Sequence, residues 1–403
     1  MIAPQIRFPE FHEEYIIDSL SEISDRVHRK NSDNQTEIPL TIASIEGLVD
    51  QRTYFGKTVA SKDMSGYYLL HNGEFAYNKS YSKGFPVGSI KRLDKYAQGA
   101  LSTLYICFAL KENADVTSDY LVQYFNSPAW YETVNEVCAE GARNHGLLNV
   151  SPDDFFATTH HFAPTKEEQD KVAAFLSLYD QKIENQMAKV EALESRRKGL
   201  LQQIFSQEIR FKADDGSDFP DWEPIPFGDV IEPFTIKTKT ENEDTLLSCA
   251  IEGMFLNSEL FDHQRGASNK GYLKIKMGTL ILSAQNLHLG NANVNLRFEH
   301  GIISPAYKTY NVTGCLPEFM GVWVKREAAK KFFYDATTTG ASQCRRNVDW
   351  DKLYSQEMEI PCEEEQRKIS VFVTLVDKQI QIEKDKLEAI KQVKKGLLQQ
   401  MFV

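Results

Sequence analysis

The chain has 403 residues, with 46 Lys and Arg against 57 Asp and Glu, which gives a formal net charge of -11 at pH 7. This length predicts two or three domains. A hydrophobic content of 42% and a longest apolar run of Thr103–Leu110 exclude a membrane-spanning protein, because a membrane helix needs about 20 apolar residues. The N-terminus lacks the pattern of a secretory signal, and the six scattered cysteines contain no C-x-x-C pair, so we expect a cytoplasmic protein with reduced thiols.

Residues 1–163 form the first predicted globular part. One of its apolar, strand-like runs ends in the polar segment Tyr77-Asn78-Lys79-Ser80, within a locally basic stretch at residues 62–92. Further on, a Gly-Ala pair at residues 141–142 precedes Arg143 and Asn144. A net negative charge argues against nucleic-acid binding only when the cations are dispersed along the chain. This local excess of cations is therefore compatible with an anionic partner.

Residues 164–207 predict one long helix. Thr165 and Glu168 match a capping box, in which the hydroxyl and the carboxylate satisfy the first free amides of the helix. Apolar residues then recur at alternating steps of three and four, a pattern typical of a coiled-coil seam. We expect this seam to include Leu176, Tyr179, Ile183, Val190 and Leu193.

Residues 208–359 contain a linker and the second predicted globular part. The linker, residues 212–223, is acidic and carries Gly and Pro. The globular part has a basic stretch at residues 265–276 that includes Lys274, and a strand-like run that ends in Ser283-Ala284-Gln285-Asn286. A second Gly-Ala pair, at residues 340–341, precedes Arg345 and Arg346.

Residues 360–403 predict a second long helix, with a seam that includes Val376, Ile380, Leu387 and Ile390. Residues 361–402 match residues 164–205 at an offset of 197 without a gap, and 19 of the 42 positions are identical. Weaker matches, such as FPEF at residues 8–11 against FPDW at residues 219–222, extend the similarity upstream. We therefore expect two copies of one unit, related by a pseudo-two-fold axis, with their helices antiparallel.

The sequence offers no candidate for catalysis. It lacks the phosphate loop G-x-x-x-x-G-K-[ST], the zinc motif H-E-x-x-H, the nucleophile elbow G-x-S-x-G and the dinucleotide turn G-x-G-x-x-G. His160 and His161 have no spaced third ligand, so we expect no metal site.

Polar and basic residues after the predicted strands and Gly-Ala pairs, or within the basic stretches, are candidates for DNA contact, because such side chains grip phosphates and read base edges. The candidates are Lys79, Ser80, Arg143, Asn144, Lys274, Gln285, Asn286, Arg345 and Arg346. The same residue types are common in solvated loops, so a structural role stays open for each. A non-catalytic coiled-coil scaffold without a nucleic-acid partner is the alternative function.

The two helices, with their shared EEQ…D…KGLLQQ pattern, resemble the conserved spacer regions of the specificity (S) subunits of type I restriction-modification systems. The FPDW segment, the stretches GYYLLHNGEFAYNKS and GYLKIKMGTLILSAQN, and the closing Gly-Ala…Asn-Val are similar to the target recognition domains of that family. The resemblance covers essentially the whole chain. One difference is Cys362, which stands where the first helix has the capping Thr165.

The resemblance implies an α+β fold, with two target recognition domains separated by two long helices that pack as an antiparallel coiled coil. Each domain would read one half of a bipartite, asymmetric sequence in double-stranded DNA, and the helices would set the spacer. The chain itself would be non-catalytic and bind no cofactor. Two methyltransferase subunits would dock on the helices and carry S-adenosylmethionine, and restriction subunits would bring ATP and Mg²⁺ to the full complex.

Overall fold

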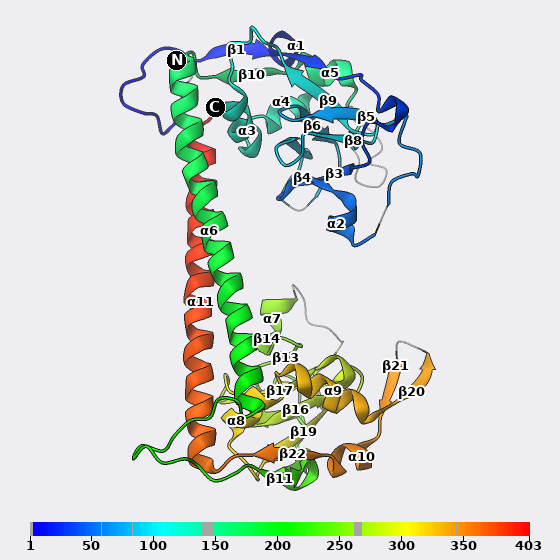
Figure 1. Ribbon diagram of the computed structural model, residues 1–403, viewed down its shortest axis with the longest axis vertical. Helices are drawn as coiled ribbons and strands as arrows, with labels where there is room; N and C mark the ends of the chain where they lie inside the picture. The colour runs from blue at the N-terminus through cyan, green and yellow to red at the C-terminus, as the bar shows by residue number, and fades with distance from the viewer. Residues whose placement is uncertain (1–2, 58, 83, 139–147, 262–267, 343–344) are drawn as a thin grey trace. The chain divides into compact units, whose positions relative to one another are not determined.

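The computed structural model describes residues 3–57, 59–82, 84–138, 148–261, 268–342 and 345–403. The chain divides into two compact units, which we call unit 1 (Met1–Ala188 with Asp385–Val403) and unit 2 (Lys189–Lys384). Each unit combines an α+β domain with one part of each long helix (Figure 1). Over the described ranges, no helix has the length and apolar character needed to cross a membrane.

Unit 1 contains two four-stranded sheets. The first is antiparallel throughout, in the order β2 (Ser24–Arg26), β9 (Ile106–Leu110), β6 (Phe75–Asn78), β7 (Ser89–Arg92). The second has the order β4 (Gly47–Asp50), β3 (Pro39–Ala43), β8 (Gln98–Leu101), β5 (Tyr68–His71), and its β3 and β8 pair in parallel. A separate antiparallel pair, β1 (Ile16–Ser19) and β10 (Thr159–Phe162), precedes the first long helix.

Unit 2 repeats this strand order. Its four-stranded sheet runs β12 (Ile231–Phe234), β19 (Tyr307–Val312), β16 (Leu280–Ser283), β17 (Ala292–Val294). The second sheet of unit 1 corresponds to two pairs, β14 (Met254–Leu256) with β13 (Leu247–Cys249) and β18 (His300–Ile303) with β15 (Leu273–Lys276), joined by a parallel bridge from Leu246 to Ile302. The pair β11 (Glu223–Pro226) and β22 (Glu357–Ile360) again precedes a long helix. The predicted internal repeat is therefore confirmed through the whole domain.

Each domain also contains several short helices. In unit 1 they are α1 (Leu20–Ile23), α2 (Gln51–Phe55), α3 (Ser118–Asn126), α4 (Tyr131–Glu136) and α5 (Pro152–Ala157), with the 3-10 turn η1 (Ser32–Asn34). In unit 2 they are α7 (Asn257–Leu260), α8 (Pro317–Trp323), α9 (Glu327–Asp335) and α10 (Trp350–Ser355), with the turns η3 (Phe227–Val230) and η4 (Leu287–Leu289). Unit 2 also has a hairpin, β20 (Thr337–Ser342) and β21 (Arg345–Val348).

The first sheet of each unit is buried on both faces, which explains its continuous apolar runs. In β9, Ile106 and Phe108 join one core cluster, whereas Cys107 joins the cluster on the opposite face. In β16, Leu280 and Leu282 likewise join one core cluster, and Ile281 joins the cluster on the opposite face. Side chains of a strand alternate between faces, so a sheet covered on both sides needs apolar residues at every position.

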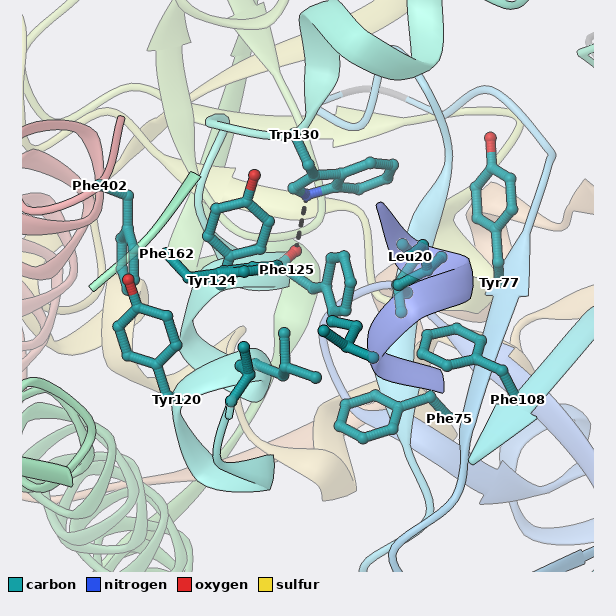
Figure 2. Close-up of a cluster of buried hydrophobic side chains, with 14 of the residues drawn as sticks. Leu20, Phe75, Tyr77, Phe108, Tyr120, Tyr124, Phe125, Trp130, Phe162 and Phe402 are labelled. Atoms are coloured by element: carbon teal, nitrogen blue, oxygen red, sulfur yellow. Dashed lines mark hydrogen bonds between the residues drawn. The ribbon is translucent and has the colours of Figure 1, made fainter. Parts of the chain in front are cut away.

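The core of unit 1 is a cluster of aromatic side chains that includes the end of the chain (Figure 2). The Trp130 indole donates to the Phe125 carbonyl at 3.1 Å, so its polar atom is satisfied inside the core. Phe402 lies against Tyr120 and Tyr124, with ring centroids 5.4 Å and 5.7 Å apart. The C-terminal turn is thereby a structural part of the first domain.

The two long helices are α6 (Lys166–Phe205) and α11 (Glu363–Gln400). Their first residues differ by 197, the offset of the sequence repeat, so the replacement of Thr165 by Cys362 does not move the start of the helix. The seam residues Leu176, Val190 and Ile380 are buried, and the remaining predicted ones are half-buried: Tyr179, Ile183, Leu193, Val376, Leu387 and Ile390. The predicted α+β class with two packed long helices is confirmed.

Candidate nucleic-acid interface and its helical support

The first candidate residues lie where β6 leaves its sheet in unit 1. Lys79 and Ser80 follow β6 directly, and both are half-buried. The Lys79 ammonium donates to the Val150 carbonyl at 3.2 Å, and the Ser80 amide donates to the Asn78 side chain at 3.0 Å. Because the Val150 carbonyl is neutral, this contact orients the Lys79 charge without neutralising it.

Unit 2 places Gln285 and Asn286 at the equivalent point, after β16, which has the same position in its sheet as β6. The Asn286 amide donates to the Ser283 hydroxyl at 3.2 Å, and the Asn286 carbonyl accepts from the Leu289 amide at 3.0 Å. The side chains of Gln285 and Asn286 are exposed. The backbone of this turn is therefore held within the domain, while two amide side chains of the type that reads adenine edges face outward.

Two basic candidates of unit 2 have partners inside their domain. Lys274 on β15 pairs with Glu243 at 2.5 Å, and this hydrogen bond lowers the pKa of Glu243 to about 2. Arg346 on β21 donates from Nε to the Thr337 hydroxyl at 2.6 Å and lies 4.0 Å from the centre of the Tyr334 ring. Each cation is therefore held by its own neighbours, and these contacts do not bring Lys274 and Arg346 into one shared site.

Three candidate side chains lie outside the described residues. Arg143 and Asn144 fall within residues 139–147, and Arg345 has a described backbone in β21 without a described side chain. Their proposed contacts with DNA stay predictions.

A buried ion pair anchors each domain to the start of a long helix. In unit 1, Arg7 donates to both carboxylate oxygens of Glu168, at 2.7 Å and 2.8 Å. In unit 2, Arg210 makes the same pair of contacts with Glu365, at 3.2 Å and 2.8 Å. Both glutamates are fully buried, so each needs its arginine.

The structure corrects the predicted capping box at this point. The Thr165 hydroxyl accepts from the Glu168 amide at 3.3 Å, as expected, but the Glu168 carboxylate serves Arg7 instead of the helix amides. Since a buried carboxylate gains more from a bidentate arginine than from backbone amides that solvent can reach, the longer-range partner prevails.

Sequence reasoning missed the two arginines, although a signal was present. Ile6-Arg7-Phe8 and Ile209-Arg210-Phe211 are identical tripeptides, and their phenylalanines pack on Phe175 and Phe372, at 5.8 Å and 5.6 Å between ring centroids. The structural equivalent of Phe8 is therefore Phe211, which the weaker match of FPEF to FPDW had obscured.

The glutamine that follows each buried glutamate ties the helix to its domain. Gln169 accepts from the Thr117 amide at 2.7 Å and donates to the Asp115 and Ala163 carbonyls. Gln366 accepts from the Leu316 amide at 2.7 Å and donates to the Pro361 carbonyl at 2.8 Å. The repeated Glu-Gln pair is thus the element that positions a domain on its helix.

Two cations of the long helices, Lys394 and Arg197, form ion pairs that obey the repeat. In unit 1, Lys394 of α11 pairs with Asp180 of α6, and in unit 2, Arg197 of α6 pairs with Asp377 of α11. Adding 197 to Asp180 gives Asp377, and adding 197 to Arg197 gives Lys394, so each pair is the counterpart of the other. Such a relation requires antiparallel helices (Figure 1).

The two ends of the chain reproduce a contact that the continuous chain makes elsewhere. The Ile6 amide donates to the Gln400 carbonyl at 2.9 Å, and the Ile209 amide donates to the Gln203 carbonyl at 3.2 Å. In unit 1 the contact joins segments from opposite ends of the sequence, and in unit 2 it joins the last turn of α6 to the residues that follow this helix. The repeat therefore extends to this backbone contact in each unit.

His160 is part of the unit 1 core. Its ring nitrogens bond to the Tyr124 hydroxyl at 3.0 Å and to the Thr158 hydroxyl at 2.8 Å, and burial lowers the pKa of His160 to about 4. Within the described ranges, no group of three or more His, Cys, Asp and Glu side chains is placed to hold a metal ion.

We compared this fold with protein-family models and with solved structures. No protein-family model matches the chain. The S subunit of a type I restriction-modification system from M. genitalium superimposes with a TM-score of 0.53 over 100% of this chain and 99% of that one, at 13% identity. A chain from a structure of the complex assembly and conformational transition of the type I R-M system gives a TM-score of 0.58 over 96% and 97%, at 14% identity. The chain has the fold of a type I restriction-modification S subunit.

Proposed function

We propose that this chain is the sequence-specific, non-catalytic specificity subunit of a type I restriction-modification complex. The observation that carries the proposal is a duplicated α+β domain on a pair of antiparallel helices, a fold shared with the M. genitalium S subunit over the length of both chains. Each domain would read one half of a bipartite target in double-stranded DNA.

The loops after β6 and β16 support an asymmetric target. They occupy equivalent positions in the two sheets, yet one presents Lys79 and Ser80 and the other Gln285 and Asn286. A lysine grips a phosphate or a guanine edge, whereas a glutamine or an asparagine can pair with adenine. Equivalent loops with unlike donors would read unlike half-sites.

The partners follow from the same proposal. Methyltransferase subunits, two for each chain, would dock on the helices and bind S-adenosylmethionine, and restriction subunits would add ATP- and Mg²⁺-dependent cleavage. Lys79, Ser80, Arg143, Asn144, Lys274, Gln285, Asn286, Arg345 and Arg346 would contact DNA in the complex. We assign no cofactor to this chain.

The test is to map methylated adenines in cells with and without this chain. We expect a bipartite motif that disappears when the gene is deleted. Exchanging residues 1–163 for another recognition domain should change one half of the motif and leave the other half intact.

A change in both halves would contradict the assignment of one half-site to each domain. If instead the purified complex shows no DNA binding with a steep negative salt slope, which phosphate contacts would give, the chain is a scaffold without a nucleic-acid partner.

A further inference from the structure

Each unit contains a pocket where the last third of one long helix meets the corner between two short helices of the domain. The unit 1 pocket measures about 490 Å³ and lies between the end of α11 and the α3–α4 corner. The unit 2 pocket measures about 520 Å³ and lies between the end of α6 and the α8–α9 corner. Each pocket lies wholly within its own unit.

The two pockets are related by the internal repeat. Lys395, Leu398 and Gln399 line the unit 1 pocket, and Lys198, Leu201 and Gln202 line the unit 2 pocket, at an offset of 197. All six belong to the KGLLQQ stretch that is identical in both helices. Since the two domains otherwise carry different loops, this identity indicates the same kind of occupant in both pockets.

Both pockets are strongly basic in a chain whose net charge is -11. The unit 1 pocket has four cations against the single carboxylate of Asp180, and the unit 2 pocket has four against that of Glu327. The cations are Lys91, Lys391, Lys394 and Lys395 in unit 1, and Arg197, Lys198, Lys325 and Arg326 in unit 2. Charge complementarity therefore calls for an acidic occupant.

Several of these cations lack a compensating charge. Among the described residues, Lys198, Lys391 and Lys395 make no hydrogen bond or ion pair. The half-buried Lys91 donates to the Asn126 side chain at 2.6 Å, and the half-buried Lys325 donates to the Ile251 carbonyl at 2.6 Å, both neutral oxygens. Burial lowers the pKa of Lys91 and of Lys325 to about 8, the result expected for desolvated cations that are short of anions.

Apolar walls distinguish a protein segment from DNA as the occupant. Phe85, Tyr131 and Leu398 line the unit 1 pocket, and Leu201 and Phe205 line the unit 2 pocket. A DNA backbone would meet the cations but has no apolar side chain to fill such a cavity. A peptide segment with carboxylates around an apolar anchor satisfies both features.

We propose that each pocket receives an acidic segment with an apolar anchor from a methyltransferase subunit, one copy of that subunit per pocket. This inference rests on the proposed function, and it adds the place and the chemistry of docking. Lys198 and Lys395 are the matched contacts, because both are exposed, identical in the repeat and without an ion-pair partner in the part of the chain that the structure describes.

The experiment is to reconstitute the full chain with its methyltransferase subunit and count the bound copies by native mass spectrometry. The wild-type chain should bind two copies. Lys198→Glu and Lys395→Glu should each bind one, and the double variant should bind none. The exposed helix residues Lys182 and Lys378 provide controls, and their replacement by Glu should leave two copies bound.

Two copies on both single variants would overturn the inference while leaving the proposed function intact. If the double variant keeps both copies but loses DNA affinity with a shallower salt slope, the pockets are phosphate sites, and the inference is also wrong. A folded wild-type chain that binds no methyltransferase subunit would instead refute the proposed function itself.

Discussion

Arg210→Met should destabilise unit 2 by leaving the Glu365 carboxylate buried without its cation. The Glu365 side chain is 1% exposed and accepts from Arg210 at 3.2 Å and 2.8 Å and from the Trp222 indole at 3.0 Å. Removing one partner of a buried pair costs about 3–5 kcal/mol in free energy of unfolding. The Arg210 side chain is 22% exposed, so water replaces part of its contact, and we expect the lower end, about 3 kcal/mol.

Removing both charges should cost much less than removing one. Arg210→Met combined with Glu365→Leu removes the uncompensated carboxylate. The main remaining loss is the hydrogen bond that the Trp222 indole donates to Glu365, and Trp222 is only 8% exposed. A lost neutral bond of this kind costs about 1 kcal/mol. The double variant should therefore regain about 2 kcal/mol relative to Arg210→Met.

Hydrogen exchange measured by mass spectrometry provides the assay, because it reports each unit separately and a two-unit chain need not unfold in one step. Arg210→Met should speed exchange in unit 2. The matched variant Arg7→Met leaves the buried Glu168 carboxylate without its cation and should speed exchange in unit 1. Two results would refute the reasoning. One is a double variant as unstable as Arg210→Met, and the other is a loss below about 1 kcal/mol in the free energy of unfolding for Arg210→Met alone.

Three further outcomes are expected. Leu176→Ala, at a fully buried seam position, should cost about 3 kcal/mol in urea unfolding, and a cost under about 1 kcal/mol would contradict its place in the unit 1 core. Because the pKa of buried His160 is lowered to about 4, folding stability should fall by up to about 3 kcal/mol between pH 6.5 and 4, and His160→Phe should remove that component of the pH dependence in urea titrations. Gln285→Ala with Asn286→Ala should relax one half of the methylated motif, and an unchanged motif would remove both residues from the interface.

The duplicated helices could be predicted from the sequence because their causes are local. The seam spacing depends on the 3.6-residue turn of a helix, and the gapless match at an offset of 197 carries the first helix onto the second. The starts at Lys166 and Glu363 obey that offset even though Cys362 replaces a capping hydroxyl. Buried apolar contacts and the Glu365 anchor compensate for a weak cap.

The candidate interface was predictable only by residue type and position after a strand. Gln285 and Asn286 lie exposed after β16, as a reading loop requires, whereas Arg346 is engaged with Thr337 and Tyr334. Which cation has a partner inside its domain depends on the hairpin β20–β21 and its neighbours, and a composition pattern does not contain that pairing.

The sequence by itself determined that this protein is one unit used twice, with an α+β domain and a long seam-bearing helix in each copy. Only the tertiary structure decided which polar groups meet: Arg7 with Glu168 across 161 residues, and Lys394 with Asp180 across 214. The physical reason is that hydrophobic periodicity specifies which face of a helix is buried, but the partner of a buried charge is set by the register of antiparallel helices and by chain segments distant in sequence. The same register brings the KGLLQQ cations against the domain corners, where the two basic pockets form.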